Sequence, residues 1–368
     1  MQERERTAMS TEKTAHSPAL DRPTALSVLA RNWALAFLVF LFIVFSFTGR
    51  GFLSLANFQN ILYQPTTFIF LASAETFVII TGGIDLSVGF VMGLSSVIAA
   101  QIMQLLASGG MGIGATLIIG SCAGVLVSLI PGFASGILIA RYRVPPFIAT
   151  LGMLGITNGV TLAICQGFPV TGVPNEAVNL GNGYLAYGFP GKGTRLFAWP
   201  HGVVDTQARL LTRIFPNSLL LWLIAILVLW FVLNRTRFGQ HTFAIGGNIG
   251  AAKRSGINVG RHLVTIYVLS ALLAGIAGVF NVFQTGVGNF TPFNASYELF
   301  AIAAVVIGGA SLMGGKGSLI GSIIGVLLLS VLENGLSISG VAAFYRFIAV
   351  GVILVIAVVI DQLFPDLF

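Results

Sequence analysis

The sequence predicts an all-α polytopic membrane protein with about ten transmembrane helices and with both termini in the cytoplasm. Three observations predict this fold class. The 368-residue chain is 56% hydrophobic and only 8% charged, whereas soluble domains carry about 25% charged residues. Long apolar runs recur along the chain and are separated by short polar turns. The 45 glycines suit helices that approach one another closely in a bilayer.

The N-terminal residues 1–31 are polar and mixed in charge, and they lack the apolar core of a secretory signal. We expect them to form a partly disordered cytoplasmic tail before a transmembrane domain over residues 32–361. The predicted spans of that domain are residues 33–47, 65–80, 88–106, 113–140, 147–166, 218–233, 263–284, 298–313, 318–332 and 344–360.

Spacing within these spans predicts how some of them pack. Pairs of glycines four residues apart, at 120 and 124 and again at 132 and 136, indicate faces for close helix packing. Residues 317, 321 and 325 repeat this spacing in a later span. The amphipathic stretch 52–64 is expected to lie at the outer interface. Cys122 and Cys165 lie in apolar runs, and we expect free, buried thiols.

The basic residues predict the orientation. Of the 19 Lys and Arg residues, thirteen fall on the side of the N-terminus in this topology and six on the other. Cytoplasmic loops carry the excess of positive charge, so the side of the N-terminus is the cytoplasm. Residues 167–216 then form a long periplasmic loop. A loop of this length without clear elements is uncommon unless it has a function.

Residues 234–261 form a polar, basic island between two apolar spans and are expected to lie in the cytoplasm. The middle of the island is compatible with a short helix that a glycine ends, a shape that suits docking into a groove of another protein. The candidate docking residues are Gly250, Ala251, Ala252, Lys253, Arg254, Ser255, Gly256 and Ile257.

The stretch 81–89, TGGIDLSVG, predicts a break in the helix at membrane depth. Such irregular backbone is tolerated only where it is buried in protein or lines a wet cavity. Asp85 or Ser87 could cap the following helix. Glu75 could line a path or form a structural hydrogen bond, since a charge at the bilayer centre costs roughly 2.5–3.5 kcal/mol. The candidates for a translocation path are Glu75, Gly82, Gly83, Asp85 and Ser87.

Other chemistry is not indicated. Four further ionisable residues lie near predicted membrane edges, where an interfacial role is expected: Glu298, Glu333, Arg346 and Asp361. The stretch 309–318, GASLMGGKGS, departs from a phosphate loop and reads as a tight turn. The four histidines do not cluster, and no spacing suggests a metal site or a catalytic triad. The net charge of +7 lies in loops, so it does not indicate nucleic-acid binding.

Five blocks in order carry a resemblance: TGGIDLSVG at 81–89, VPPFIATLGM at 144–153, FAIGGN at 243–248, AAKRSGINV at 251–259 and, over 297–318, YEL followed by IAAVVIGGASLMGGKGS. Together they resemble the permease subunits of ribose-type sugar ABC importers, a family for ribose, xylose, arabinose, galactose and autoinducer-2. The resemblance covers roughly residues 35–361.

The resemblance implies a non-catalytic, multi-pass permease of the bacterial inner membrane that forms the path for a pentose or hexose-like monosaccharide. Its implied partners are a periplasmic sugar-binding protein, a second permease copy or sister chain, and a cytoplasmic ATPase with two nucleotide-binding modules. The chain itself would hold no cofactor, because ATP and magnesium belong to the ATPase. The candidate docking residues at 250–257 would form the coupling loop that contacts this ATPase.

Two features depart from the family pattern. Gly250 stands where many importers have a glutamate, and Phe300 stands where relatives often carry an aspartate. Two alternatives to a sugar permease also remain: a permease for another small solute such as branched-chain amino acids, and an ion-coupled secondary transporter. The latter needs broken helices in corresponding halves, and the nearest counterpart of 81–89 is residues 308–317.

Overall fold

The computed structural model describes residues 33–197, 211–290 and 296–363. The predicted tail 1–31 lies outside the described residues. The helices are α2 (Trp33–Thr48), α3 (Leu55–Tyr63), α4 (Thr66–Ile80), α5 (Val88–Ser108), α6 (Ile113–Ala140), α7 (Pro146–Cys165), α8 (Asn175–Gly181), α9 (Asn217–Arg235), α10 (Arg237–Gly247), α11 (Ile249–Arg254), α12 (Val259–Thr285), α13 (Tyr297–Ile307), α14 (Leu319–Ile338) and α15 (Ala343–Leu363). The strands are β1 (Tyr184–Phe189), β2 (Gly193–Leu196) and β3 (Thr212–Pro216).

Each predicted span contains a helix, which confirms a polytopic helical membrane protein at this coarser level. Within the described residues, 6 helices are long and apolar enough to cross a membrane, namely α5, α6, α7, α9, α12 and α14. Shorter apolar helices lie in α2, α13 and α15. The predicted span 298–313 is too long, because α13 ends at Ile307 and the glycines that follow leave the helix.

The sequence shows no clear secondary structure in residues 167–216, but the structure contains both helix and strands there. The all-α prediction therefore needs a small correction. The loop contains α8 and a three-stranded antiparallel sheet in which β1 pairs with both β2 and β3. Gly191 and Gly193, with φ of 78° and 77°, form the tight turn between β1 and β2. The strands are only 6, 4 and 5 residues long, so their pattern is weak in a sequence dominated by apolar helices.

The amphipathic helix α3 is tied to the sheet and to α9. The Gln59 side-chain amide donates to the Arg213 carbonyl of β3, and the Trp222 indole donates to the Leu62 carbonyl at 3.3 Å. The Tyr63 hydroxyl donates to Asn182 Oδ1 at 2.5 Å, and burial raises the pKa of Tyr63 to about 12. These contacts place α3 and the sheet at the same end of the protein.

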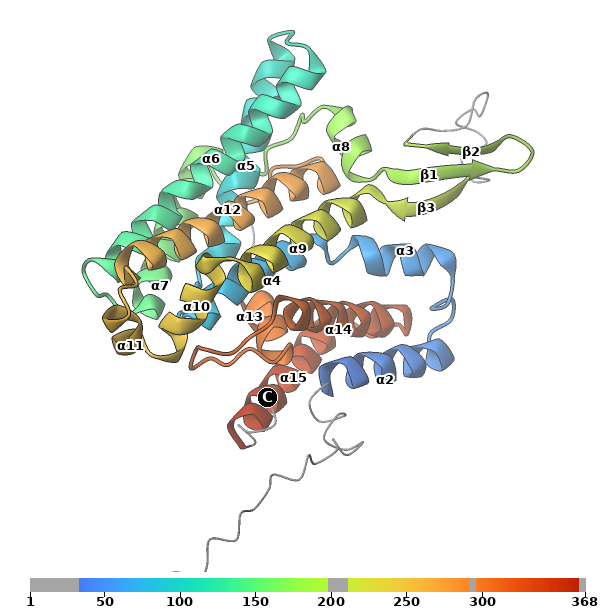
Figure 1. Ribbon diagram of the computed structural model, residues 1–368. Coiled ribbons are helices and arrows are strands. Elements are labelled where there is room, and N and C mark those ends of the chain that lie inside the picture. The colour runs from blue at the N-terminus through green and yellow to red at the C-terminus, as the bar shows by residue number, and fades with distance from the viewer. Residues whose placement is uncertain (1–32, 198–210, 291–295, 364–368) are drawn as a thin grey trace, which may run out of the picture.

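Figure 1 shows α10 and α11 at one end of the helical body and the three-stranded sheet at the opposite end. The end of α6 and the start of α12 meet beside α11, where Arg141 and Arg261 line a common surface recess. The basic turns of the sequence therefore gather at the end opposite the sheet, as the charge distribution predicts.

Helix α12 is the central element of the bundle and packs against α4, α5 and α6. The glycine faces of α6 explain this arrangement. Gly120 and Gly124 lie against α5, and Gly132 and Gly136 lie against α12. A Cβ atom added to Gly132 would lie 2.4 Å from the Ala271 Cβ, so a larger residue would separate the helices. The predicted packing faces are confirmed.

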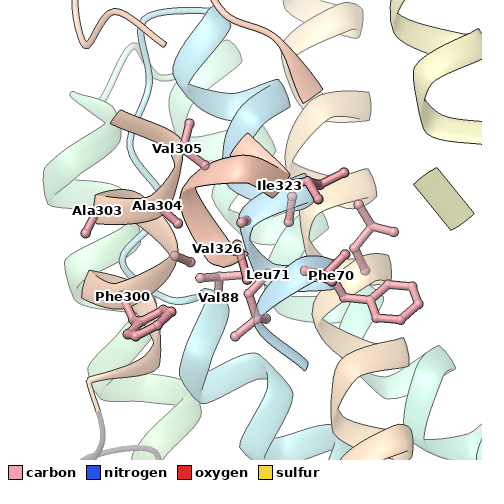
Figure 2. Close-up of a cluster of buried hydrophobic side chains, with 14 of the residues drawn as sticks. Phe70, Leu71, Val88, Phe300, Ala303, Ala304, Val305, Ile323 and Val326 are labelled. Carbon is pink, nitrogen blue, oxygen red and sulfur yellow. The ribbon is translucent and has the colours of Figure 1, made fainter. Parts of the chain in front are cut away.

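A second close contact joins α13 and α14. A Cβ atom on Gly325 would lie 1.9 Å from the Ala304 carbonyl oxygen, and Gly308 faces Gly321 at a similar separation. Around this contact, apolar side chains of α4, α5, α13 and α14 form one core cluster, part of which Figure 2 shows. Phe300 lies in this cluster with its ring 4.1 Å from that of Phe68.

Both cysteines are free, as expected, but their burial differs. Cys165 is buried against α5, whereas Cys122 is exposed on α6. The prediction of a buried Cys122 is wrong because α6 buries only its glycine face and turns the other face outward. In a membrane helix an exposed face meets lipid, so an apolar sequence does not show which residues are buried.

Candidate functional site

The predicted docking residues form a short protruding helix. Asn248 begins α11 by accepting a hydrogen bond from the Ala251 amide at 2.9 Å. Gly256 follows the helix in the left-handed conformation, with φ of 82°, which glycine adopts without strain. The prediction of a short helix ended by a glycine is confirmed. Of the eight candidates, Gly250, Lys253, Arg254, Ser255 and Gly256 are exposed.

One face of α11 is anchored and the other is free. Ala252 is 3% exposed and packs with Ile245 and Val259 in a small apolar cluster. Ile249 is 47% exposed although it is a large apolar residue. The protruding face therefore combines an exposed apolar side chain with the charges of Lys253 and Arg254.

Three glycine-containing turns meet behind α11, and we call this meeting point the glycine junction. They are the end of α10 at Gly246, the end of α4 at Ile80–Gly82, and the turn at Gly314–Gly315. The Gly315 amide donates to the Ile80 carbonyl at 2.8 Å. A Cβ atom on Gly246 would lie only 1.7 Å from that same carbonyl oxygen. The three backbones thus touch directly, with no side chain between them.

The glycine junction connects the α10–α11 segment to the predicted break in the helix. Gly82 has φ of 79° and ends α4. The chain then runs without helix until Val88 begins α5, which confirms the break. Asp85 Oδ1 accepts hydrogen bonds from the Ser87 amide at 3.0 Å and the Ser87 hydroxyl at 2.6 Å. Asp85 therefore organises the turn that precedes α5, whereas Ser87, the N-cap residue of α5, makes no capping hydrogen bond through its side chain.

Asp85 also binds the central helix. The Ser270 hydroxyl donates to Asp85 Oδ2 at 2.8 Å. Ser270 stands close to the midpoint of α12, which spans Val259–Thr285, so the broken stretch reaches the middle of the bundle. The sequence alone does not single out Ser270. A small hydroxyl residue in an apolar helix is common, and no spacing in the sequence links it to Asp85.

Glu75 lies beside this turn and is fully buried on α4. Its carboxyl group interacts with the Asp85 backbone amide, but neither carboxyl oxygen, nor the Tyr267 hydroxyl, makes a hydrogen bond of normal geometry in the described part of the chain. Asp85, Glu298 and Tyr267 lie close enough to Glu75 for electrostatic interaction. The sequence alone does not single out Tyr267.

Glu298 belongs to the same region rather than to the membrane edge where an interfacial role was expected. It is 8% exposed on α13, and its carboxyl faces Gly89 at the start of α5. The buried polar residues around the break form the central acidic cluster: Glu75, Asp85, Ser87, Tyr267, Ser270 and Glu298. Within the described residues, the polar atoms of this cluster that lack a hydrogen bond of normal geometry belong to Glu75, Tyr267 and Glu298.

The five path candidates are therefore brought together. Glu75, Gly83, Asp85 and Ser87 are buried in this conformation, while Gly82 is exposed. Among the residues that the structure describes, no group of three or more His, Cys, Asp or Glu side chains could hold a metal ion. The arrangement offers hydrogen-bonding groups at the centre of the bundle, and one backbone junction leads from them to α11.

The chain is similar to known transport proteins over most of its length. Residues 57–358 match the family described as branched-chain amino acid transport system / permease component. The ribose import permease protein RbsC of Escherichia coli (strain K12) is 35% identical over 334 residues, which are 91% of this chain and 94% of that protein.

Two further similar proteins are also sugar import permeases. RbsC of Bacillus subtilis (strain 168) is 37% identical over 325 residues, 88% of this chain and 90% of the relative. The galactose/methyl galactoside import permease protein MglC of Escherichia coli (strain K12) is 34% identical over 353 residues, 94% of this chain and 98% of the relative. No solved structure matches the chain. The resemblance in the five sequence blocks is thus confirmed, and the chain belongs to the branched-chain amino acid transport system / permease component family as a multi-pass, non-catalytic permease subunit of the inner membrane.

Proposed function

We propose that this chain forms the membrane path of an ABC importer for a monosaccharide, either a pentose or a hexose. The sugar class rests on relatives that are ribose and galactose import permeases and that align with 88% or more of this chain. The buried acceptor groups of the central acidic cluster support a substrate with many hydroxyl donors.

The observation that carries the proposal is the connection between the protruding helix α11 and the interior of the bundle. In this proposal α11 docks into a groove of a separate cytoplasmic ATPase with two nucleotide-binding modules. ATP, with magnesium, is bound and hydrolysed on that partner. Closure of the ATPase modules displaces α11, and the glycine junction transmits this displacement to the broken stretch 81–87.

The path itself is proposed to run along the break between α4 and α5. Gly82 and Gly83 allow the backbone to leave the helix, and Asp85 and Ser87 hold the resulting turn. Glu75 presents its carboxyl group beside that turn. A transported sugar needs a route that binds weakly and can be rehydrated, rather than a tight site. Delivery by a periplasmic binding protein and pairing with a second permease, identical or a sister chain, complete the proposed importer.

The test is ATP turnover by the complex that co-purifies with this chain from its native membrane. We expect an associated ATPase whose turnover rises when a binding protein loaded with ribose or galactose is added. Uptake into liposomes should follow the same sugar. If ATP turnover rises instead with a leucine-loaded binding protein, the substrate is a branched-chain amino acid, as the family description says. Uptake that needs an ion gradient and no ATPase would contradict the importer.

The matched variant for this test is the double substitution Lys253→Glu and Arg254→Glu. Both side chains are exposed on α11, so reversal of their charges leaves the buried anchor at Ala252 intact. We expect normal membrane abundance with loss of the co-purified ATPase. Lys192→Glu, in the turn between β1 and β2 at the opposite end, is the control that should retain the ATPase. Retention by both variants would refute docking through α11.

A further inference from the structure

A polar pocket lies apart from the break in the helix, among α3, α4, α14 and α15. Its volume is about 250 Å³. Drug-sized ligands occupy pockets of roughly 300–1,000 Å³, so this pocket suits a smaller molecule of monosaccharide size. It lies toward the end of the protein that carries the sheet, because α14 reaches it with its last two turns and α15 with its first.

The lining of this pocket is unusual for a membrane protein. It is mainly polar and is formed by Asn60, Ile61, Gln64, Phe68, Ser330, Glu333, Asn334, Ser337 and Arg346. Lipid-facing surfaces avoid such groups, so the lining marks a recess open to water near the membrane edge, where the sequence predicts Glu333 and Arg346. Glu333 and Arg346 both line the pocket, so it contains an acidic and a basic side chain.

Two atoms in the lining have unused hydrogen-bonding capacity. Asn334 Nδ2 donates to Asn57 Oδ1 at 2.9 Å, which fixes the orientation of the amide. The other end of that amide, Oδ1, is buried and accepts no hydrogen bond from a described residue. The Arg346 Nε is likewise buried and donates none. Other protein atoms cover both of these atoms, so they reach a sugar hydroxyl, which both donates and accepts, only when their side chains turn toward the pocket.

The pocket adjoins the central acidic cluster. Phe68 lines the pocket, and its ring lies 5.0 Å from the ring of Tyr297. The residue after Tyr297 is Glu298, whose carboxyl faces Gly89 at the start of α5. A molecule in the pocket would therefore be separated from the cluster by the Phe68–Tyr297 pair.

We propose that this pocket is a binding site for a monosaccharide at the outward-facing end of the path, occupied before the sugar passes the Phe68–Tyr297 pair. The inference rests on the proposed sugar import and adds a site with named contacts. Asn334 and Arg346 bind the sugar hydroxyls, Glu333 accepts from them, and the apolar face of Phe68 packs against the sugar ring. Because the lining holds an acidic side chain as well as a basic one, it favours a neutral polyol over an anion.

The experiment measures protection of an introduced cysteine by sugar. Ser337→Cys is placed in the pocket of the full chain in lipid nanodiscs, with Cys122→Ser and Cys165→Ser as background. The rate of reaction with a small, charged thiol reagent is measured with D-ribose or D-galactose. At a sugar concentration of about three times Kd the rate should fall about fourfold, because only the free site reacts. Ser339→Cys, exposed outside the pocket, should keep its rate.

Asn334→Leu should abolish the protection at position 337. In the assembled importer, Asn334→Leu and Arg346→Gln should each lower the maximal uptake rate severalfold while the loaded binding protein still stimulates ATP turnover. Arg50→Gln, an exposed basic residue at the same end, is the control and should import at the normal rate.

The outcomes separate this inference from the proposed function. Absence of protection, in an importer that takes up the same sugar, overturns the pocket and leaves sugar import standing. If sugar slows the labelling of both cysteines, at 337 and 339, equally, the binding site is also overturned, because the sugar then acts on thiol reactivity in general and not through the pocket. Protection that follows lipid composition rather than sugar assigns the pocket to a lipid headgroup. If the importer takes up neither ribose nor galactose, and its ATP turnover does not rise with either sugar, both the proposed function and the proposed binding site are refuted.

Discussion

At the scale of single residues, Asp85 and Glu75 differ in how they are bonded, although both are buried carboxyl groups of the same region. Asp85 accepts three hydrogen bonds from Ser87 and Ser270 and joins the break to α12. Glu75 accepts none of normal geometry within the described residues. We interpret Asp85 as a structural anchor and Glu75 as the residue whose hydrogen-bonding capacity is available to a substrate.

This difference predicts separate effects of substitution. Asp85→Ala should lower stability by about 1–3 kcal/mol, because it leaves buried donors unpaired, so membrane abundance and uptake should fall together. Glu75→Gln should keep abundance and thermal stability near normal while uptake falls severalfold. Membrane abundance by immunoblot, thermal unfolding in detergent and sugar uptake are the measurements.

The control for Glu75→Gln is Glu176→Gln, which removes an exposed carboxyl on α8 and should change nothing. If Glu75→Gln lowers abundance in proportion to uptake, Glu75 has a folding role only. If Glu75→Gln changes neither abundance nor uptake, Glu75 does not belong to the translocation path.

At the scale of elements, α4, α10 and the turn after α13 meet through backbone atoms alone at the glycine junction. A Cβ at Gly246 would collide with the Ile80 carbonyl, whereas a Cβ at the adjacent Gly247 would meet nothing within 4 Å. These neighbours in one helix therefore form a matched pair. The same substitution should have different consequences at the two positions.

We expect Gly246→Ala to retain the ATPase and its turnover but to lose most coupling of that turnover to uptake, because α10 is pushed away from the end of α4. Gly247→Ala should behave as the unsubstituted protein. The ratio of sugar imported to ATP hydrolysed in liposomes measures the effect. Gly82→Ala is the milder second variant, since it strains a φ of 79° with only the Met313 carbonyl nearby, at 3.6 Å.

An unchanged ratio in Gly246→Ala, with normal abundance, would show that the glycine junction does not transmit the displacement. If Gly246→Ala fails to reach the membrane, the Gly82→Ala ratio decides the question, and a normal ratio there contradicts the proposal. Loss of coupling in Gly247→Ala as well would point to a general disturbance of α10.

At the scale of the whole molecule, α11 and the sheet lie at opposite ends (Figure 1), so they should be reached from opposite sides of the membrane. In a background of Cys122→Ser and Cys165→Ser, Thr194→Cys in β2 should react with a membrane-impermeant thiol reagent from the periplasmic side. Lys253→Cys in α11 should react only in inside-out vesicles. Both positions are exposed, so accessibility depends on the side alone.

Labelling of both cysteines from the same side would contradict the orientation derived from the basic turns. Labelling of Lys253→Cys from the periplasm and of Thr194→Cys from the cytoplasm would invert it. In either case the proposed ATPase contact at α11 would be lost.

The sequence by itself determined the membrane class, the positions of the apolar helices, the break at 81–89, the short helix at α11 and the family. These features are local: apolar length, glycine spacing, charge in turns and each of the five sequence blocks can be seen within a short stretch of the chain. The glycine pairs of α6 predicted its packing faces correctly for the same reason, since spacing along one helix defines a face.

Only the tertiary structure brought Asp85 to Ser270, Gly246 to Ile80, and Asn334 to Asn57. The partners in these contacts are separated by many residues and come from helices whose apolar sequences look alike. In a bilayer, buried and lipid-facing residues have the same polarity, so apolar pattern could not tell which face of α6 or α12 is inside. The three-stranded sheet escaped prediction because antiparallel pairing of such short strands is decided by the partner strand, not by the strand itself.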